Sequence, residues 1–110
     1  MAVELKTRNN EAEQQYELEA DAVPVGLAQY RLGQSGLAFV HTEIAPEVSG
    51  QGLGGVLIQA ALEDARKKGL NVLPYCTFVR HYIETHPEYM DLVPPERRPA
   101  FGFPMVLEES

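Results

Sequence analysis

Three stretches in the first half of the chain alternate between apolar and polar residues, which is the pattern of strands with one buried face. The first runs from Tyr16 to Ala20, the second covers residues 25–32, and the third covers residues 37–44. In the third stretch the alternation places on one face Leu37, Phe39, His41 and Glu43. Residues 33–36 hold two glycines that favour a hairpin turn. We therefore expect an antiparallel meander.

The second half of the chain changes to a helical period. Residues 53–68 predict the longest helix, with an apolar stripe made of Val56, Leu57, Ala60, Ala61 and Ala65. Three basic residues and a glycine close this helix. A short apolar strand follows at residues 70–73, then a second helix at residues 77–85 and a helical turn at residues 88–92. Strand, helix and strand in this order favour a parallel crossover.

The two ends of the chain carry weaker patterns. Residues 1–11 are polar and predict no regular structure, whereas residues 94–110 are rich in proline and predict an extended tail. We expect this tail to pack Phe101 and Phe103 onto the body. The sequence thus predicts a single domain over residues 1–110, with its core at residues 12–93. Its fold class is α/β (mixed α+β), in which an antiparallel meander leads into a βαβα unit.

Composition limits the classes of function. The chain has 110 residues, of which 45% are hydrophobic, enough for one core. A formal net charge of −7 disfavours nonspecific nucleic-acid binding; the acidic surface either attracts a cationic acceptor or serves only solubility. The single cysteine excludes an internal disulfide and agrees with a reducing compartment. No apolar run approaches the ~18 residues of a membrane span, and the N-terminal stretch is not a signal peptide, so we expect a cytoplasmic protein without a membrane partner.

Four glycines lie within six residues between the third strand and the long helix. We call residues 49–55 the glycine turn; its sequence is Ser49-Gly50-Gln51-Gly52-Leu53-Gly54-Gly55. A helix start has unpaired N–H groups and a positive dipole end, so it can hold a phosphate, and glycines let the phosphate approach the backbone. No Ser, Thr, Asp or Asn stands where a helix cap is expected. A tight turn without any ligand is the alternative.

The glycine spacing does not fit two familiar phosphate-binding loops but resembles a third. It is Gly50-x-Gly52-x-Gly54, which is not the dinucleotide fingerprint, and no Lys-Ser or Lys-Thr pair follows as in a nucleotide-triphosphate loop. It resembles the acyl-coenzyme A loop of the GNAT superfamily of N-acetyltransferases, Arg/Gln-x-x-Gly-x-Gly/Ala. In this comparison Ser49 takes the place of the Arg or Gln, and Gly52 and Gly54 are the two glycines.

Further motifs resemble the minimal, single-domain GNAT-like acetyltransferases over residues 12–93. They are His41-Thr42, the glycine turn, one long helix, Cys76 before a second helix, and His86-Pro87-Glu88-Tyr89. The resemblance implies splayed central strands, acetyl-coenzyme A as cofactor, and a primary amine as acceptor. It implies that the pantetheine arm pairs with the backbone between Ile44 and Val48. The cofactor-binding set is then Ile44, Val48, Ser49, Gly50, Gln51, Gly52, Leu53, Gly54, Gly55, Cys76, Arg80 and Tyr82.

Three side chains are candidates for catalysis. Cys76 stands at a predicted helix N-terminus, where the dipole favours a thiolate that can accept an acyl group; alternatively it is a small buried hydrophobe. His41 suits proton removal from an amine, and together with Cys76 it can form a nucleophile-and-base pair. Glu43 can orient His41 or take the proton itself. Alternatively His41 is a packing residue and Glu43 faces solvent. Arg80 lies one helix turn after Cys76 and can meet a phosphate or face solvent. Tyr82 lies where GNAT proteins often carry a tyrosine near the cofactor sulfur, but the Asn and Ala that normally precede that tyrosine are absent here.

Several alternatives stay open at this level. Acyl transfer through Cys76 and direct attack by the amine on the thioester are both compatible with these residues. The acceptor is a protein lysine, a polyamine or a small metabolite. A coenzyme A binding module with little turnover, and a purely structural domain, are the competing functions. A metal site is not expected, because His81, Glu84 and His86 offer too few ligands.

Overall fold

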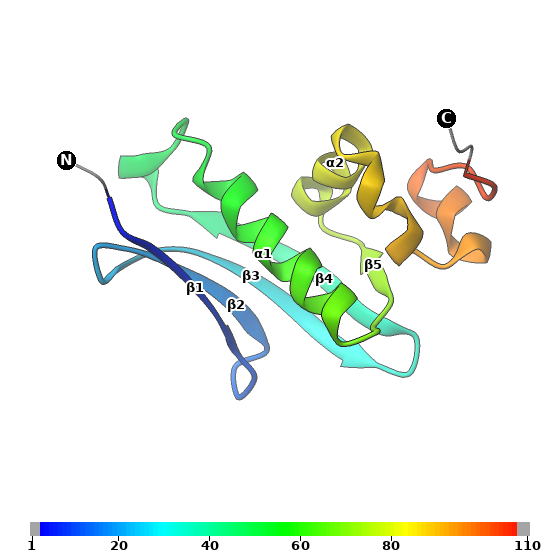
Figure 1. Ribbon diagram of the computed structural model, residues 1–110, viewed down its shortest axis with the longest axis horizontal. Coiled ribbons are helices and arrows are strands. Elements are labelled where there is room, and N and C mark those ends of the chain that lie inside the picture. The colour runs from blue at the N-terminus through cyan, green and yellow to red at the C-terminus, as the bar shows by residue number, and fades with distance from the viewer. Residues whose placement is uncertain (1–2, 108–110) are drawn as a thin grey trace.

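The computed structural model describes residues 3–107 of the chain. Its sheet has five strands in the order β1-β2-β3-β4-β5 (Figure 1). The strands are β1 (Leu5–Asn10), β2 (Gln15–Ala20), β3 (Val23–Gly33), β4 (Gly36–Ile44) and β5 (Val72–Pro74). The first four are antiparallel neighbours, whereas β5 runs parallel to β4. The predicted meander and the parallel pair across the long helix are therefore confirmed.

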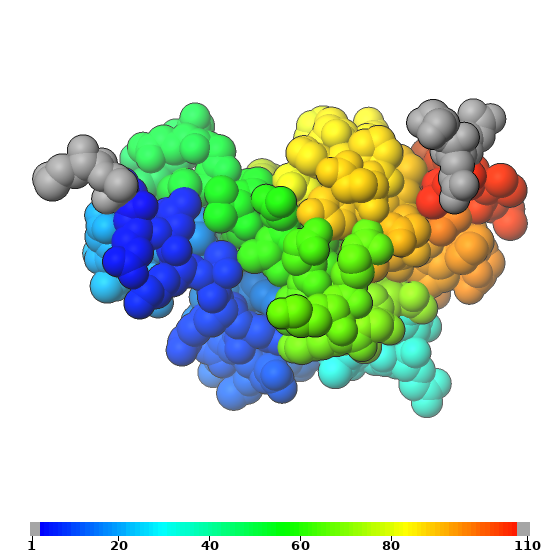
Figure 2. Space-filling view, in the orientation of Figure 1, coloured from blue at the N-terminus to red at the C-terminus, as the bar shows by residue number. Residues whose placement is uncertain are grey.

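Helical segments make up most of the second half. They are η1 (Pro46–Val48), α1 (Leu53–Lys67), α2 (Thr77–Thr85), η2 (Pro87–Leu92) and η3 (Pro95–Phe101). Helix α1 crosses one face of the sheet, and α2 lies beside it (Figure 1). In the space-filling view α1 (green) separates the N-terminal strands (blue) from the C-terminal helical segments (yellow to orange; Figure 2). The mixed α/β fold class predicted from the sequence is confirmed.

The core lies between α1 and the meander. The helix buries Leu57, Ile58, Ala61, Leu62 and Ala65. Tyr16, Tyr30 and Phe39 contribute a cluster of aromatic rings from three adjacent strands, with ring centroids 5.4 to 6.2 Å apart. Burying such apolar surface supplies most of the driving force for folding. It also fixes the position of α1, and hence of the glycine turn at its start.

A β-bulge in β4 changes which residues share a face. Phe39 pairs with Tyr30 and His41 pairs with Gln29, so Val40 has no partner on β3. The extra residue shifts the alternation by one. Thr42 therefore shares the helix-covered face with Phe39, while His41 turns to the other face. The prediction that Leu37, Phe39, His41 and Glu43 lie on one side is wrong, because it assumed an uninterrupted strand.

The two chain ends also differ from the predictions. Residues 5–10, expected to lack regular structure, form β1 along the free edge of β2. The proline-rich tail is not extended over residues 95–101, where it forms the 3₁₀ helix η3. Proline is tolerated at the first position of such a turn because the missing N–H is not needed there. Phe101 and Phe103 are both buried, so the predicted packing of the tail is confirmed.

Candidate functional site

The glycine turn presents a row of backbone donors at the start of α1. Gly52 is the N-terminal cap residue, with φ +76°, a backbone conformation that glycine adopts without strain. No side chain caps the helix, and its first turn holds no acidic residue. Within residues 3–107, the amides of residues 52–55 donate to no backbone acceptor, and the first helical bond runs from Val56 to Gly52 at 3.4 Å. These four donors are therefore available to an anion.

Two of the three amides just before this row have partners in the residues that precede the glycine turn. The Ser49 amide donates to the Pro46 carbonyl at 3.2 Å, and the Gln51 amide donates to the Val48 carbonyl at 3.3 Å, whereas the Gly50 amide donates to no backbone acceptor within residues 3–107. A bound phosphate consequently finds most of its donors in the helix half of the glycine turn. Between Ile44 and the glycine turn, the chain forms η1 (Pro46–Val48), a single 3₁₀ turn.

Two adjacent glycines of α1 face two aromatic rings of α2. A Cβ built on Gly54 would come within 2.4 Å of Cζ of Phe78, so the ring lies against this glycine. A Cβ on Gly55 would be 3.6 Å from Tyr82, an ordinary contact. Gly54 is thus required by packing between α1 and α2, whereas Gly55 has room for a side chain. The contact also brings the first turns of the two helices together.

Strands β4 and β5 separate soon after they begin to pair. Their register covers Leu37 to Phe39 against Val72 to Pro74. Beyond this point β4 continues to Ile44, while the segment that follows β5 turns away into α2. Over residues 40–44, no described strand pairs with this edge of β4. We call the space between residues 40–44 and residues 75–78 the β4–β5 fork; an extended ligand can use its backbone groups.

Cys76 stands where the fork begins. Its amide donates to the Phe39 carbonyl at 2.8 Å, and it is the N-terminal cap residue of α2. Its Sγ lies 3.3 Å from Oγ1 of Thr42. The cysteine is half-buried. The sulfur is therefore held beside the free edge of β4 and remains partly accessible.

The structure does not bring His41 to Cys76. Nε2 of His41 is 3.7 Å from Oε2 of Glu43, and both side chains are more than half exposed. The bulge at Val40 turns this pair away from the face on which Thr42 meets Cys76. The nucleophile-and-base pair that the sequence suggested is not formed, while the predicted proximity of Glu43 to His41 is present.

The two α2 residues expected near the cofactor lie in different surroundings. Arg80 donates through Nε to the Pro74 carbonyl at 3.4 Å, and its guanidinium lies 5.5 Å from the centre of the Phe101 ring. Arg80 therefore faces the C-terminal segment. It is two residues away from both Phe78 and Tyr82 along α2, so it lies on a different side of this helix. Tyr82 stacks on His86 with centroids 3.9 Å apart. Burial raises the pKa of Tyr82, so its hydroxyl stays protonated at neutral pH.

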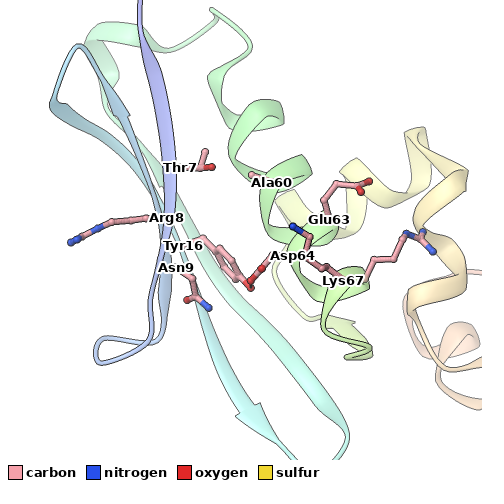
Figure 3. A pocket seen from close by; sticks show the side chains of 9 residues that line it. Thr7, Arg8, Asn9, Tyr16, Ala60, Glu63, Asp64 and Lys67 are labelled. Carbon is pink, nitrogen blue, oxygen red and sulfur yellow. Dashed lines mark hydrogen bonds between the residues drawn. The ribbon is translucent and has the colours of Figure 1, made fainter.

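A hollow of about 570 Å³ lies elsewhere, between β1 and α1 (Figure 3). Its carboxylates are already engaged. Tyr16 donates to Asp64 at 2.7 Å, and Tyr89 donates to Glu63 at 2.7 Å. Burial and this bond raise the pKa of Tyr89 to about 12. These contacts tie strands and helices together, so this hollow is better explained by fold stability than by acyl transfer.

No group of three or more His, Cys, Asp or Glu side chains in residues 3–107 is arranged to hold a metal ion. Over the same residues, no helix has both the length and the apolar content to cross a bilayer. Thr42 and Phe78, which border the fork, were not among the predicted site residues. A single hydroxyl and a single aromatic ring give no spacing signal in a sequence.

The sequence profile of one family, described as GCN5-related N-acetyl-transferase, matches residues 15–92. The match covers β2 to η2, including the glycine turn, the fork and α2. No curated protein matches the chain.

Proposed function

Because the chain belongs to the GCN5-related N-acetyltransferase family, we propose that it transfers an acetyl group from acetyl-coenzyme A to a primary amine. The pyrophosphate of the cofactor lies on the amides of residues 52–55. The pantetheine arm runs along the free edge of β4, near Ile44 to Val48. The acceptor is a protein lysine, a polyamine or a small amine metabolite, and the net charge of −7 favours such a cation.

One observation supports this proposal above the others. The uncapped start of α1 adjoins the β4–β5 fork, because Gly54 lies against the Phe78 ring at the border of the fork. A glycine turn that served packing alone would need a small residue at Gly54, against Phe78. It would not need to leave the start of α1 without a side-chain cap and without any acidic residue in its first turn.

The residues proposed for catalysis lie on both faces of β4, with His41 and Glu43 on one face and Cys76 on the other. Acetyl-coenzyme A supplies a thioester, whose carbonyl carbon is the electrophile. In direct transfer the amine nitrogen forms the new bond to this carbon, the carbon–sulfur bond breaks, and the sulfur leaves as a thiolate. His41, supported by Glu43, accepts the proton that the amine loses. In the relay, Sγ of Cys76 as a thiolate forms the new bond to the carbonyl carbon, and coenzyme A leaves as a thiolate. The amine then attacks the acetyl-cysteine, the bond to Sγ breaks, and Sγ is released as a thiolate.

Arg80 has a smaller part in this proposal than the sequence suggested. Its guanidinium is engaged with the Pro74 carbonyl and the Phe101 ring, and it would have to leave both to reach a phosphate. The first turn of α1, together with Tyr82 beside Gly55, carries the phosphate contacts instead. Ser49, Gly50, Gln51 and Val48 shape the turn that presents these amides.

The test changes charge at the start of α1 without changing shape. Gly55→Asp and Gly55→Asn have the same size, and a Cβ at Gly55 makes only an ordinary contact with Tyr82. An acidic residue in the first helical turn stabilises a helix, so neither variant should unfold the protein. Isothermal titration with acetyl-coenzyme A should show affinity at least about tenfold weaker for Gly55→Asp than for Gly55→Asn, because a carboxylate repels the phosphates. Equal affinities would remove the proposed phosphate site.

A second measurement separates the enzyme from its alternatives. Protein incubated with acetyl-coenzyme A and a lysine peptide or spermidine is followed by mass spectrometry, with Cys76→Ala beside the wild type. Acetylated acceptor indicates an enzyme; a Cys76 adduct lost in the variant indicates the relay. Binding without any acetylated product would indicate a coenzyme A binding module. If the protein is a purely structural domain, acetyl-coenzyme A should leave its melting temperature unchanged. If it binds acetyl-coenzyme A, a concentration of 100 times Kd should add about 2.7 kcal/mol to the free energy of unfolding.

A further inference from the structure

The bulge in β4 gives Thr42 a position that alternation alone would deny it. With Val40 unpaired, Thr42 pairs with Ala28 and faces the same side as the buried Phe39. Without the extra residue it would face the opposite side, where His41 and Glu43 now lie. Because of the bulge, Thr42 borders the fork and His41 and Glu43 do not.

Cys76 is held from both sides of this bulge. Its backbone amide donates to the Phe39 carbonyl at 2.8 Å, before the bulge, and its sulfur meets the Thr42 hydroxyl at 3.3 Å, after it. Within residues 3–107, the Thr42 hydroxyl forms no other side-chain hydrogen bond. The threonine is half-buried, like the cysteine, so water competes only partly for this contact.

We propose that Thr42 is a positioning residue for acyl transfer, whose hydroxyl holds the Cys76 sulfur at the β4–β5 fork and donates a hydrogen bond to it. This inference rests on the acyl-transfer function proposed above. A neutral thiol can either donate to the threonine or accept from it, but a thiolate can only accept. The contact consequently strengthens as the sulfur loses its proton, and it aims the sulfur along the free edge of β4.

The role extends to direct transfer as well as to the relay. In the relay, the sulfur must approach the thioester carbon from a fixed direction, and a hydrogen bond to Thr42 restricts its rotation. In direct transfer, the same pair forms the wall against which the thioester lies. In neither route does Thr42 itself form a covalent bond or take up a proton.

The test uses a reaction that needs no coenzyme A. Iodoacetamide alkylates Cys76, forming a sulfur–carbon bond and releasing iodide, and Cys76 is the only cysteine in the chain. We compare the wild type with Thr42→Val, which keeps the branched shape without the hydroxyl, and Thr42→Ser, which keeps the hydroxyl. The Thr42 hydroxyl donates to the sulfur as it attacks, and a single hydrogen bond of this kind raises the rate by roughly threefold once the weaker nucleophilicity of a hydrogen-bonded sulfur is included. We expect Thr42→Val to react about threefold more slowly and Thr42→Ser to react at nearly the wild-type rate.

The outcomes are separable. Equal rates for the wild type and Thr42→Val, or equally slow rates for Thr42→Val and Thr42→Ser, would overturn the positioning role. Circular dichroism checks folding, and Thr42→Ala takes the place of Thr42→Val if the latter does not fold. If the protein binds no acetyl-coenzyme A, the alkylation rates still report on Thr42, so the two hypotheses fail independently. In an active enzyme, Thr42→Val should lower kcat and leave KM for acetyl-coenzyme A within about twofold.

Discussion

Gly54 and Gly55 are neighbours in the sequence and have different structural reasons for being glycine. Gly54 is buried against the Phe78 ring, and any Cβ there would meet the ring. Gly55 is half-buried and has room beside Tyr82. A glycine inside a helix costs about 0.5–1 kcal/mol relative to alanine. At residue 54 that cost is unavoidable, because the packing of α1 on α2 depends on it.

We predict that Gly54→Ala destabilises the protein and that Gly55→Ala does not. The added methyl at residue 54 must displace Phe78, and overpacking of this kind costs about 1–3 kcal/mol. At residue 55 the methyl fits, and we expect a gain of about 0.5 kcal/mol from helix propensity. Urea unfolding measures both variants.

Phe78→Ala supplies the control for this pair. If the ring is the obstacle, Gly54→Ala should cost much less in a Phe78→Ala background than in the wild type, which a double-mutant cycle measures. A penalty of the same size in both backgrounds would show that some other contact requires the glycine.

The residues of the candidate site were predictable to different degrees. The glycine turn is visible in the sequence because it needs a fixed residue type at fixed spacing. The position of His41 was not, because it depends on a bulge at Val40, which has no sequence signal of its own. Thr42 and Phe78 were missed for a related reason: their roles arise from contacts with Cys76 and Gly54, which only the packing of α2 creates.

At the scale of elements, periodicity located most strands and helices. The helix expected at residues 77–85 is α2, and that expected at residues 53–68 is α1, one residue shorter. Strand β1 was missed because it has mostly exposed side chains, so no apolar alternation marks it. An edge strand of this kind is specified by its partner, β2, through backbone bonds that any residue except proline can make.

The hydrogen bond between Tyr16 of β2 and Asp64 of α1 joins the sheet to its covering helix. Tyr16 is buried, and its hydroxyl donates to Asp64 at 2.7 Å, while Lys68 reaches the same carboxylate at 2.9 Å. Burial alone would raise the pKa of Asp64, but these two contacts lower it below its ordinary value. The folded state therefore prefers the ionised form of this side chain more strongly than the unfolded state does.

We predict that this bond makes part of the stability depend on acid pH. A carboxyl whose pKa is lowered by folding contributes stability above its unfolded pKa, about 3.9, and loses that contribution as pH falls through its folded value. Tyr16→Phe removes the donor, and we expect a loss of about 1–2 kcal/mol at pH 7. The difference between the two proteins should shrink below about pH 4. Urea unfolding at several pH values measures it, and a constant difference down to pH 2 would contradict the assignment.

At the scale of the whole molecule, the C-terminal segment is part of the fold. Arg98 is only 6% exposed, and its guanidinium donates to three carbonyls, those of Val93, Met90 and Met105. These bonds join η2, η3 and the residues that follow. Arg97, its neighbour, is less buried and donates to the Tyr75 hydroxyl.

We predict that Arg98→Ala costs about 2–4 kcal/mol, because the carbonyls of Val93, Met90 and Met105 lose the donor that joins them. Arg97→Ala removes the same charge one residue away, and should cost less than about 1 kcal/mol. Chemical denaturation gives both values, and limited proteolysis should release the segment after residue 93 in Arg98→Ala alone. Equal costs for the two variants would show that overall charge, rather than the buried contacts, holds the segment.

The distribution of charge leads to a prediction about how the cofactor would arrive. The chain carries a formal charge of −7, and acetyl-coenzyme A is also an anion, so the two repel at long range. The proposed phosphate site relies on backbone amides of residues 52–55, which act only at short range. Salt screens the repulsion over about 10 Å at 0.1 M but affects the contacts within the site much less. We therefore expect the association rate constant to rise between about 0.01 and 0.15 M salt.

Stopped-flow measurements of acetyl-coenzyme A binding at constant temperature test this expectation, with sodium chloride as the only variable. A site built on lysine or arginine would behave in the opposite way, because salt would screen an attraction. Lys67→Gln, at the far end of α1 from the glycine turn, makes the net charge more negative without touching the proposed site. It should therefore steepen the rise with salt and leave the dissociation rate constant unchanged. An association rate that falls with salt would instead place basic side chains, not the amides of α1, at the phosphates.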